Sequence, residues 1–376
     1  MKLYPGGRLA STAVGLTIAG AVLLSACSSS DNKAGGSSSS AGGSSSSAGG
    51  DCAKGTLNGE GSTAQKNAMD QWTKSFQGQC SGATVNYNAT GSGNGVKNFI
   101  NKQVTFAGSD SALNPKKGEV ANAEKACGSP AVNLPMVVGP IAVAFKVKGV
   151  DDAGLTLNPK LVAQIFLGKI SKWNDPAIAG ANSGVTLPDE AITVFFRSDE
   201  SGTTENFEKY LAAAAPSDFT AEPSKAWAGK VGQGKAKSGG VQEAISATEG
   251  GIGYVEWSYA VSGNLSTAKI DNGGGAVAID ADTASKAAGA ATVTGTGDDV
   301  SLKIDYATKE GGAYPIILVT YEIVCTKYSD SSAAGLVKSF LTYTAGGGQA
   351  ELANLGYAPI PDSIKTKVTA SIAKIS

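Results

Sequence analysis

Eight consecutive residues, Arg197 to Thr204, combine an arginine, hydroxyl side chains and a glycine in the order Arg-Ser-Asp-Glu-Ser-Gly-Thr-Thr. They follow the strand-like run 192–196 and lead into the helix-like run 205–211. The first backbone N–H groups of a helix have no internal partner, and the aligned peptide dipoles make that end partly positive. Hydroxyl side chains add donors, so the stretch predicts an anion site. The alternative interpretation is an ordinary helix start capped by Ser201 or Thr203.

Two other hydroxyl residues stand at the same kind of junction. Thr63 and Ser92 each follow a strand-like run and precede a helix-like run, and Asp110 ends the third strand-like run. This βαβαβ order predicts a parallel sheet, whose ligands bind beyond the carboxyl ends of the strands. We therefore expect the three side chains at one edge of the sheet. The expected elements include helices over 64–77, 96–103 and 240–248 and strands over 84–88 and 105–110.

Composition excludes several classes of function. The chain of 376 residues contains no histidine, which removes histidine-based nucleophile activation, histidine proton shuttles and His-ligated zinc. The net charge of −1 gives no indication of a nucleic-acid partner, which requires a basic patch. The glycine-rich run 91–95 lacks the third glycine of the dinucleotide fingerprint and the lysine of a P-loop. We expect neither a cofactor nor a metal.

The N-terminus has the pattern of an export signal. Two basic residues precede the apolar run 13–24, which is too short to span a bilayer stably. The run ends in Leu24-Ser25-Ala26-Cys27, which resembles a bacterial lipobox, where the chain is cut before the cysteine and the thiol is lipidated. We therefore predict a signal peptide over 1–26 and lipidation of Cys27, with plain signal-peptidase cleavage as the alternative.

Residues 27–50 are almost entirely serine, glycine and alanine after the cysteine. Such a tract cannot bury apolar surface and behaves as a flexible coil. Together with a lipid on Cys27, it predicts a tether that holds a globular body to the extracytoplasmic face of the cell membrane.

Four cysteines follow the tether, an even number in an exported chain, which predicts two disulfides. Three connectivities are possible. We favour Cys52–Cys80 and Cys127–Cys325, because each pair joins segments that we expect to be neighbours. A metal site is the alternative, but the cysteines have no CxxC spacing to support it.

Two long apolar strand patterns, 133–145 and 314–325, are expected to run side by side and to join two α/β lobes. This arrangement is similar to the type II periplasmic-binding-protein fold, in which two crossing strands connect the lobes. The first lobe would comprise residues 52–140 and 316–376, and the second lobe residues 141–315. The Ala-, Gly- and Thr-rich stretch 273–299 predicts no clear element.

Five segments, in order along nearly the whole mature chain, resemble the phosphate-binding lipoproteins of the bacterial high-affinity phosphate ABC transporter, the PstS type. The resemblance is greatest to those of mycobacteria and related actinobacteria. The segments are Gly61–Ala64, Gly91–Gly95, Phe106–Asp110, Ile165–Ile170 together with Trp173–Pro176, and Arg197–Thr204.

The resemblance implies a solute-binding lipoprotein, not an enzyme, that captures inorganic phosphate between its lobes and delivers it to the permease subunits of the transporter. Its implied phosphate ligands are Thr63, the backbone of Ala64, Ser92, Asp110, Arg197, Ser201, Gly202 and Thr203. Asp199 would orient the guanidinium of Arg197. Asp110 would accept the O–H of hydrogen phosphate, a proton that sulfate lacks, and a site built for a substrate hydroxyl rejects analogues without it.

One residue departs from the resemblance, and two other functions remain as alternatives. Glu200 stands where many relatives have glycine, which leaves open the effect of a carboxylate next to Ser201. A secreted phosphatase with Ser92 or Ser201 as nucleophile would need a base or a metal, and the chain has no histidine and no evident metal-ligand cluster. A surface adhesion protein that kept the fold and lost transport is the other alternative.

Overall fold

The computed structural model describes residues 52–150 and 154–376. The predicted signal peptide, the lipidation site Cys27 and the tether 27–50 lie outside the described residues. Within the described part of the chain, no helix has the length and apolar character needed to cross a membrane.

The first lobe begins with the predicted βαβαβ unit. Strand β1 (Gly55–Gly61) lies between β2 (Ala83–Ala89) and β3 (Phe106–Ser109) and is parallel to both. Helices α1 (Lys66–Gln79) and α2 (Ser92–Ile100) make the two connections. The carboxyl ends of all three strands therefore meet at one edge, as the sequence predicted.

Helix α2 starts at Ser92, four residues earlier than the sequence predicted, because the glycine-rich run is its first turn and not a separate loop. Gly91, which precedes the helix, has a φ of 104° that favours glycine. Gly95 is required for a different reason: a Cβ there would lie 2.5 Å from the Cα of Gly61. The glycines thus allow α2 to begin directly against the end of β1.

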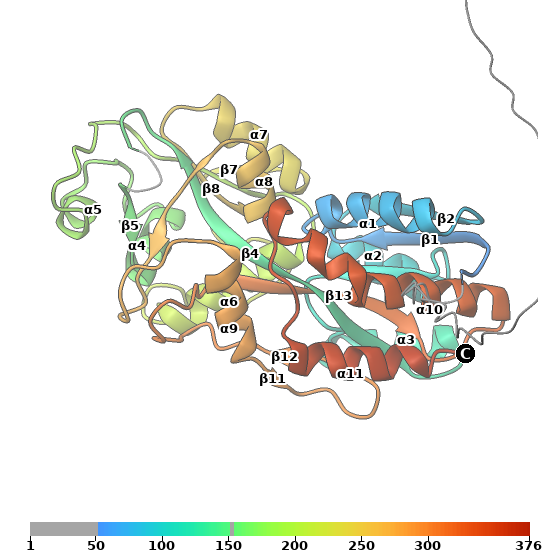
Figure 1. Ribbon diagram of the computed structural model, residues 1–376. Coiled ribbons are helices and arrows are strands. Elements are labelled where there is room, and N and C mark those ends of the chain that lie inside the picture. Colours follow the sequence, from blue (N-terminus) through green and yellow to red (C-terminus); the bar gives the residue numbers. More distant parts are fainter. Residues whose placement is uncertain (1–51, 151–153) are drawn as a thin grey trace, which may run out of the picture. The chain divides into compact units, whose positions relative to one another are not determined.

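Strand β4 (Ala131–Lys146) connects the two lobes (Figure 1). Its first part pairs antiparallel with β13 (Ile317–Cys325), with Ile317 opposite Pro140 and Cys325 opposite Ala131. The sequence prediction that these two long apolar strands lie side by side is confirmed. The first-lobe strand order is β2-β1-β3-β13-β4.

The second part of β4 continues into the second lobe. There it pairs with β8 (Gly251–Glu256), which is followed by β6 (Thr193–Arg197) and β7 (Gln233–Lys235). The helices between β4 and β13 in the sequence are α4 (Pro159–Phe166), α5 (Pro176–Ala181), α6 (Gly202–Ala214), α7 (Lys237–Ala247), α8 (Trp257–Ser262) and α9 (Ala281–Gly289). The short strands are β5 (Thr156–Leu157), β9 (Ser266–Thr267), β10 (Lys269–Ile270), β11 (Thr292–Val293) and β12 (Leu302–Lys303).

The stretch 273–299, which predicted no element, contains α9. Asp280 accepts a hydrogen bond from the backbone N–H of Thr283, and the hydroxyl of Thr283 accepts one from the N–H of Asp280. This reciprocal capping box starts a helix whose buried face consists only of alanines. Alanine gives a weak periodic signal, which explains why the apolar pattern failed to indicate this helix.

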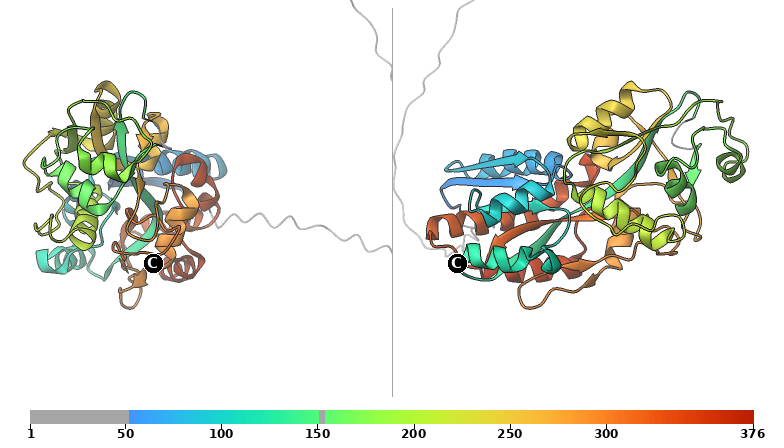
Figure 2. Two further views of the ribbon diagram at one scale, coloured as in Figure 1. Left: turned by 90° about the vertical axis from the view of Figure 1, so that its left-hand side faces the viewer. Right: turned by 180° about the vertical axis from the view of Figure 1, so that it is seen from behind.

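Helices cover both faces of the first-lobe sheet, as the views from opposite sides in Figures 1 and 2 show. One face carries α1 and α10 (Ser331–Ala345), and Phe76, Phe106 and Phe340 pack together beneath them. The other face carries α2 and α3 (Glu119–Cys127) over a smaller apolar cluster. The chain ends in α11 (Asp362–Ala373), which packs against α10. Short 3-10 turns occupy Pro115–Lys117, Gly347–Glu351 and Ala353–Leu355.

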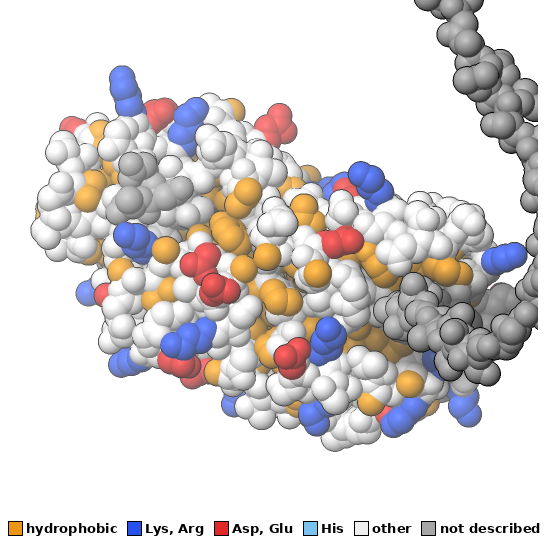
Figure 3. Space-filling model, in the orientation of Figure 1, with side chains coloured by type: hydrophobic (Ala, Val, Ile, Leu, Met, Phe, Trp, Pro, Cys, Tyr) orange, Lys and Arg blue, Asp and Glu red, His pale blue; other side chains and the backbone are white. Residues whose placement is uncertain are grey.

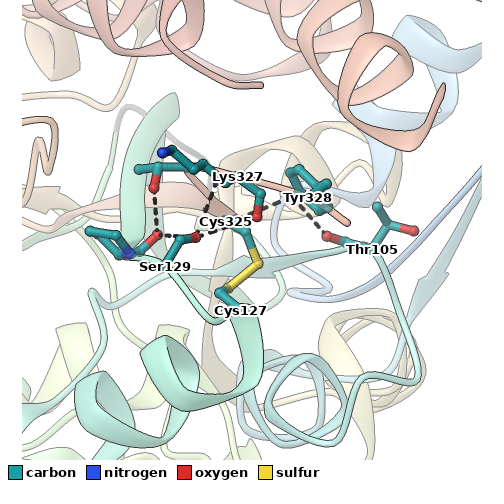
Figure 4. The surroundings of a disulfide bond; sticks show 8 residues. Thr105, Cys127, Ser129, Cys325, Lys327 and Tyr328 are labelled. Carbon is teal, nitrogen blue, oxygen red and sulfur yellow. Dashed lines mark hydrogen bonds between the residues drawn. A yellow bond between two sulfur atoms is a disulfide. The ribbon is translucent and has the colours of Figure 1, made fainter. Parts of the chain in front are cut away.

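Two disulfide bonds, Cys52–Cys80 and Cys127–Cys325, have the connectivity that the sequence favoured. The second joins the end of α3 to the end of β13, with Cα atoms 5.5 Å apart (Figure 4). Around it, the hydroxyl of Tyr328 donates to the carbonyl of Thr105 at 3.1 Å and accepts from the N–H of Cys325 at 3.2 Å. The disulfide therefore closes a loop that includes the whole second lobe.

Removing Cys127–Cys325 with a double alanine substitution is expected to destabilise the fold more than removing Cys52–Cys80 in the same way. The sequence separations are 198 and 28 residues, and a longer closed loop restricts the unfolded chain more. The difference in the free energy of unfolding should be about 1–2 kcal/mol. Urea denaturation of the two variants measures it, and equal losses would contradict the loop-length argument.

Candidate functional site

The predicted ligand residues of the two lobes meet where the first-lobe strands end and α6 begins. A Cβ at Gly202, the first residue of α6, would lie 2.5 Å from the Cβ of Asp110 and 2.8 Å from the hydroxyl oxygen of Ser92. A Cβ at Gly91 would lie 2.8 Å from a carboxylate oxygen of Asp199. Glycine is therefore needed on both sides, because backbone from one lobe lies directly against side chains of the other.

The eight predicted ligand residues are all buried, but their present hydrogen-bond partners differ. Ser201 is the N-cap of α6 and accepts from the N–H of Thr204 at 3.3 Å, so the ordinary capping role also holds. The N–H of Ala64 donates to the hydroxyl of Ser62 at 3.0 Å. The buried residues are Thr63, Ala64, Ser92, Asp110, Arg197, Ser201, Gly202 and Thr203.

Asp110 is held by hydroxyl groups. One carboxylate oxygen accepts from Ser62 at 2.5 Å and from Thr320 at 2.8 Å, and the other accepts from Ser92 at 2.9 Å. No lysine or arginine is among its partners in the described part of the chain. Burial raises the pKa of Asp110 to about 6, although the three hydroxyl bonds act to lower it. The carboxyl group is thus a hydrogen-bond acceptor without a neutralising cation.

Thr320 reaches Asp110 from the middle of β13. The pairing of β13 with β4 shifts register between Thr320 and Tyr321, which marks a β-bulge. Sequence reasoning missed Thr320 because it lies within a continuous apolar run, where no local signal separates it from its neighbours.

Arg197, at the end of β6, forms a two-point ion pair with Asp199. Its Nε donates to one carboxylate oxygen at 2.8 Å and one terminal nitrogen donates to the other at 2.5 Å. Burial acts to raise the pKa of Asp199, but the guanidinium of Arg197 outweighs it and lowers the pKa. Asp199 also accepts from the N–H of Lys237 at 2.9 Å, so it connects β6 to the start of α7. The prediction that Asp199 orients Arg197 agrees with this geometry.

Two further buried groups of the second lobe belong to the site and were missed. Ser238, near the start of α7, lies 2.8 Å from the hydroxyl of Thr63 and 3.2 Å from the remaining terminal nitrogen of Arg197. Glu256, the last residue of β8, accepts from the hydroxyl of Thr203. The Ser238-Gly239-Gly240 sequence is another hydroxyl–glycine helix start, but the prediction placed that helix at 240–248, whereas α7 begins at Lys237.

The first-lobe loops are tied to the second lobe by hydrogen bonds to their backbone. The hydroxyl of Tyr259 in α8 donates to the carbonyl of Thr63 at 3.0 Å. The side-chain amide of Asn206 in α6 donates to the carbonyl of Asp110 at 2.7 Å. These bonds position the backbone of both first-lobe residues from the opposite lobe.

Glu200, whose effect the sequence left open, lies at the rim of the site. Its side chain is exposed, and its carboxylate lies over Gly93 of α2, while its carbonyl accepts from the N–H of Gly93 at 3.3 Å. The carboxylate therefore does not enter the group of buried donors.

A cavity of about 1100 Å³ adjoins Asp110 between the lobes, and its lining includes Asn206, Lys116, Lys209 and Tyr306. On the molecular face in Figure 3, basic and acidic side chains are interspersed and form no extended basic surface.

Glu322 lies behind Asp110 on β13, opposite Gly108 of β3. It is buried, and neither carboxylate oxygen has a hydrogen-bond partner among the described residues. Burial raises its pKa to about 8, and the charge of Asp110 adds to the rise. The raised pKa favours the protonated form of Glu322, which carries no negative charge.

Two α/β lobes joined by β4, with a buried set of donors between them, define the class of two-lobed solute-binding proteins. A family model described as a PBP superfamily domain matches residues 46–347. The chain is 45% identical over 369 residues to phosphate-binding protein PstS 3 of Mycobacterium tuberculosis, covering 97% of this chain and 98% of that protein. The Mycobacterium leprae protein of the same name is 45% identical over 380 residues, covering 100% of both chains. The chain belongs to the PstS family of phosphate-binding proteins.

Solved structures show the same fold. The high-affinity periplasmic phosphate-binding protein PfluDING, bound with phosphate, matches with a TM-score of 0.68 at 24% identity, over 84% of this chain and 93% of that chain. A phosphate-binding protein from Stenotrophomonas maltophilia matches with a TM-score of 0.66 at 20% identity, over the same shares of the two chains.

Replacing Glu322 with glutamine is expected to remove a pH dependence from the stability of the fold. The folded pKa of about 8 lies above the ordinary value of 4.5, so the folded protein keeps a proton that the unfolded chain releases. The contribution of Glu322 to the free energy of unfolding is therefore fully present below about pH 4.5 and decreases as the pH rises to about 8. Relative to wild type, Glu322→Gln should gain roughly 3–5 kcal/mol across this window.

Urea denaturation of both proteins at several pH values measures that gain. A Glu200→Gln variant, which removes an exposed carboxylate, is the matched control and should parallel wild type. A constant difference between wild type and Glu322→Gln across the window would contradict a protonated Glu322.

Proposed function

We propose that this protein captures inorganic phosphate between its two lobes and delivers it to the permease of an ABC transporter. The observation that carries the proposal is the pairing of a buried carboxyl group held only by hydroxyls, Asp110, with a buried guanidinium, Arg197, on opposite sides of one site. An anion that also carries a proton matches both groups. The printed names of the relatives, phosphate-binding proteins, support this choice.

In this proposal the O–H of hydrogen phosphate donates to Asp110, and its other oxygens accept from donors of both lobes. The starts of α2 and α6 direct backbone N–H groups toward the site, which favours an anion, although those of Gly93 and Thr204 already donate to Glu200 and Ser201. Arg197 supplies the one full positive charge, with part of its guanidinium already paired to Asp199. The proposed ligands are Thr63, Ala64, Ser92, Asp110, Arg197, Ser201, Gly202 and Thr203.

The lobe boundaries and the membrane attachment are part of the proposal. We assign 52–140 with 316–376 to the first lobe and 141–315 to the second. In support, β4 pairs with β13 up to Pro140 and with β8 from Ile141 onward. A lipid on Cys27 and the tether 27–50 would hold the protein at the extracytoplasmic face of the membrane. Palmitate labelling that is lost in Cys27→Ala, with release of the protein from membranes, would support this.

The protein would act by binding and without catalysis. The chain has no histidine, and no cluster of three potential metal ligands occurs within the described residues. Equilibrium binding of labelled phosphate to the mature protein, stripped of phosphate beforehand, tests the proposal. Saturable binding without release of phosphate from an ester substrate is expected. Failure to bind phosphate would overturn the function, and ester hydrolysis would reassign it to the phosphatase alternative.

Asp110→Asn is expected to narrow the preference for phosphate over sulfate by at least about 10-fold, because an amide can donate to an oxygen that carries no proton. Calorimetric titration with each anion measures the ratio of dissociation constants. Glu200→Gln, which removes a carboxylate at the exposed rim, is the charge-matched control and should leave the ratio unchanged. An unchanged ratio in Asp110→Asn would contradict the proton-accepting role of Asp110.

A further inference from the structure

Ser238 is a buried hydroxyl residue that joins the cation of one lobe to a hydroxyl of the other. It lies in the first turn of α7 and is 1% exposed. Its Oγ is 3.2 Å from Nη1 of Arg197 and 2.8 Å from Oγ1 of Thr63. Thr63 is a proposed phosphate ligand in the first lobe, whereas Ser238 is absent from the set of ligands that the family resemblance implies.

The direction of the bond between Arg197 and Ser238 follows from the chemistry of the groups, whereas either hydroxyl could donate in the bond between Ser238 and Thr63. A guanidinium can only donate, so Ser238 must be the acceptor of the bond from Arg197. The single hydroxyl proton of Ser238 is then available for Oγ1 of Thr63, which is its second contact. With Thr63 as the acceptor of that bond, its own proton is left for a different acceptor. Each bond in such a chain polarises the next, so the charge of Arg197 strengthens Thr63 as a donor.

The carboxylate of Asp199, which orients Arg197, also fixes the position of Ser238. Asp199 accepts from the N–H of Lys237, the residue before Ser238, at 2.9 Å. Lys237 has a φ of 64°, in the left-handed region that side-chain-bearing residues rarely adopt. Such strain persists only where surrounding contacts hold it, and it clusters at ligand sites. Asp199 therefore places both the guanidinium and the hydroxyl next to it.

Thr63 is fixed from the second lobe as well. The hydroxyl of Tyr259 donates to its carbonyl at 3.0 Å, and the Thr63 side chain is buried. Thr63 thus receives one contact on its backbone and one on its hydroxyl from the opposite lobe. The contact with Ser238 therefore bears on the direction of the Thr63 hydroxyl proton.

We propose that Ser238 is a positioning residue for phosphate capture, which accepts from Arg197 and donates to Thr63 so that Thr63 donates to an unprotonated phosphate oxygen. This inference rests on the proposed function. The hydrogen-bond series Arg197–Ser238–Thr63 complements Asp110. Asp110 requires a protonated oxygen on the ligand, whereas Thr63 requires an unprotonated oxygen. This series of hydrogen bonds also passes from one lobe to the other, so it links the contact between the lobes to the binding of the anion.

A double-mutant cycle tests the proposal on the phosphate-stripped mature protein, with isothermal titration of inorganic phosphate. Ser238→Ala should weaken phosphate binding about 5- to 30-fold, the range for losing one bond in a charge-linked network. Thr63→Val, which removes the hydroxyl at similar volume, should weaken it at least as much. In the Thr63→Val background, Ser238→Ala should change affinity less than about 2-fold, because both substitutions break the same chain.

Ser246→Ala, on the same helix but bonded to Gln242, is the matched control and should bind phosphate like wild type. Ser238→Thr keeps the hydroxyl and should restore binding to within about 3-fold of wild type. Melting temperatures of the phosphate-free variants report folding separately. If Ser238→Ala lowers its melting temperature, Thr63→Val and Ser238→Thr still decide the question.

Three results would overturn the inference. Ser238→Ala that binds phosphate as tightly as wild type would leave Ser238 without a role in capture. An equal loss with and without the Thr63 hydroxyl would mean that Ser238 does not act through Thr63. Ser238→Thr that binds as weakly as Ser238→Ala, with the melting temperature of wild type, would exclude the hydroxyl as the cause. Absence of phosphate binding in wild type would instead overturn the proposed function.

Discussion

The ion pair between Arg197 and Asp199 is the interaction on which the rest of the site depends. A buried guanidinium is tolerated only when it is paired, and removing one partner of a buried pair costs about 3–5 kcal/mol. Asp199 uses both oxygens for Arg197 and also accepts from the N–H of Lys237. The carboxylate therefore neutralises the cation, orients it and sets where α7 starts. One terminal nitrogen of Arg197 is left to contact Ser238.

In the first lobe, the charge of the buried Asp110 carboxylate has to be stabilised without a cation. Asp110 is buried beside an anion site, where a second ionised carboxylate would repel the ligand. Ser62, Ser92 and Thr320 stabilise its charge by hydroxyl donors that bring no positive charge. Burial of Glu322 behind it raises the pKa of that carboxyl group and favours its uncharged form. The second lobe thus presents the buried cation Arg197 and the first lobe the buried carboxyl group of Asp110, which we propose accepts the ligand's proton; the glycines at the contact allow the lobes to lie close together.

Much of this arrangement was predictable because it rests on local patterns and on chain order. The βαβαβ unit, the pairing of β4 with β13 and the cap at Ser201 follow from periodicity and helix-start residues. Helix α9 was missed because its buried face is alanine, and α2 was placed too late because glycines inside a helix resemble a turn. Thr320 could not be recognised, since a hydroxyl inside a mostly apolar strand becomes significant only through its contact with the distant Asp110.

By itself, the sequence determined which chemistry was available: hydroxyl and glycine residues at three helix starts, one arginine among them, a strand-end aspartate and no histidine. Only the tertiary structure decided how those groups are used. Thr320 and Asp110 are 210 residues apart, and Thr63 and Ser238 are 175 residues apart. The local pattern of apolar and polar residues indicates neither contact. The direction of a hydroxyl proton and the charge of a buried carboxyl depend on such neighbours, because hydrogen bonds and burial are properties of the folded surroundings.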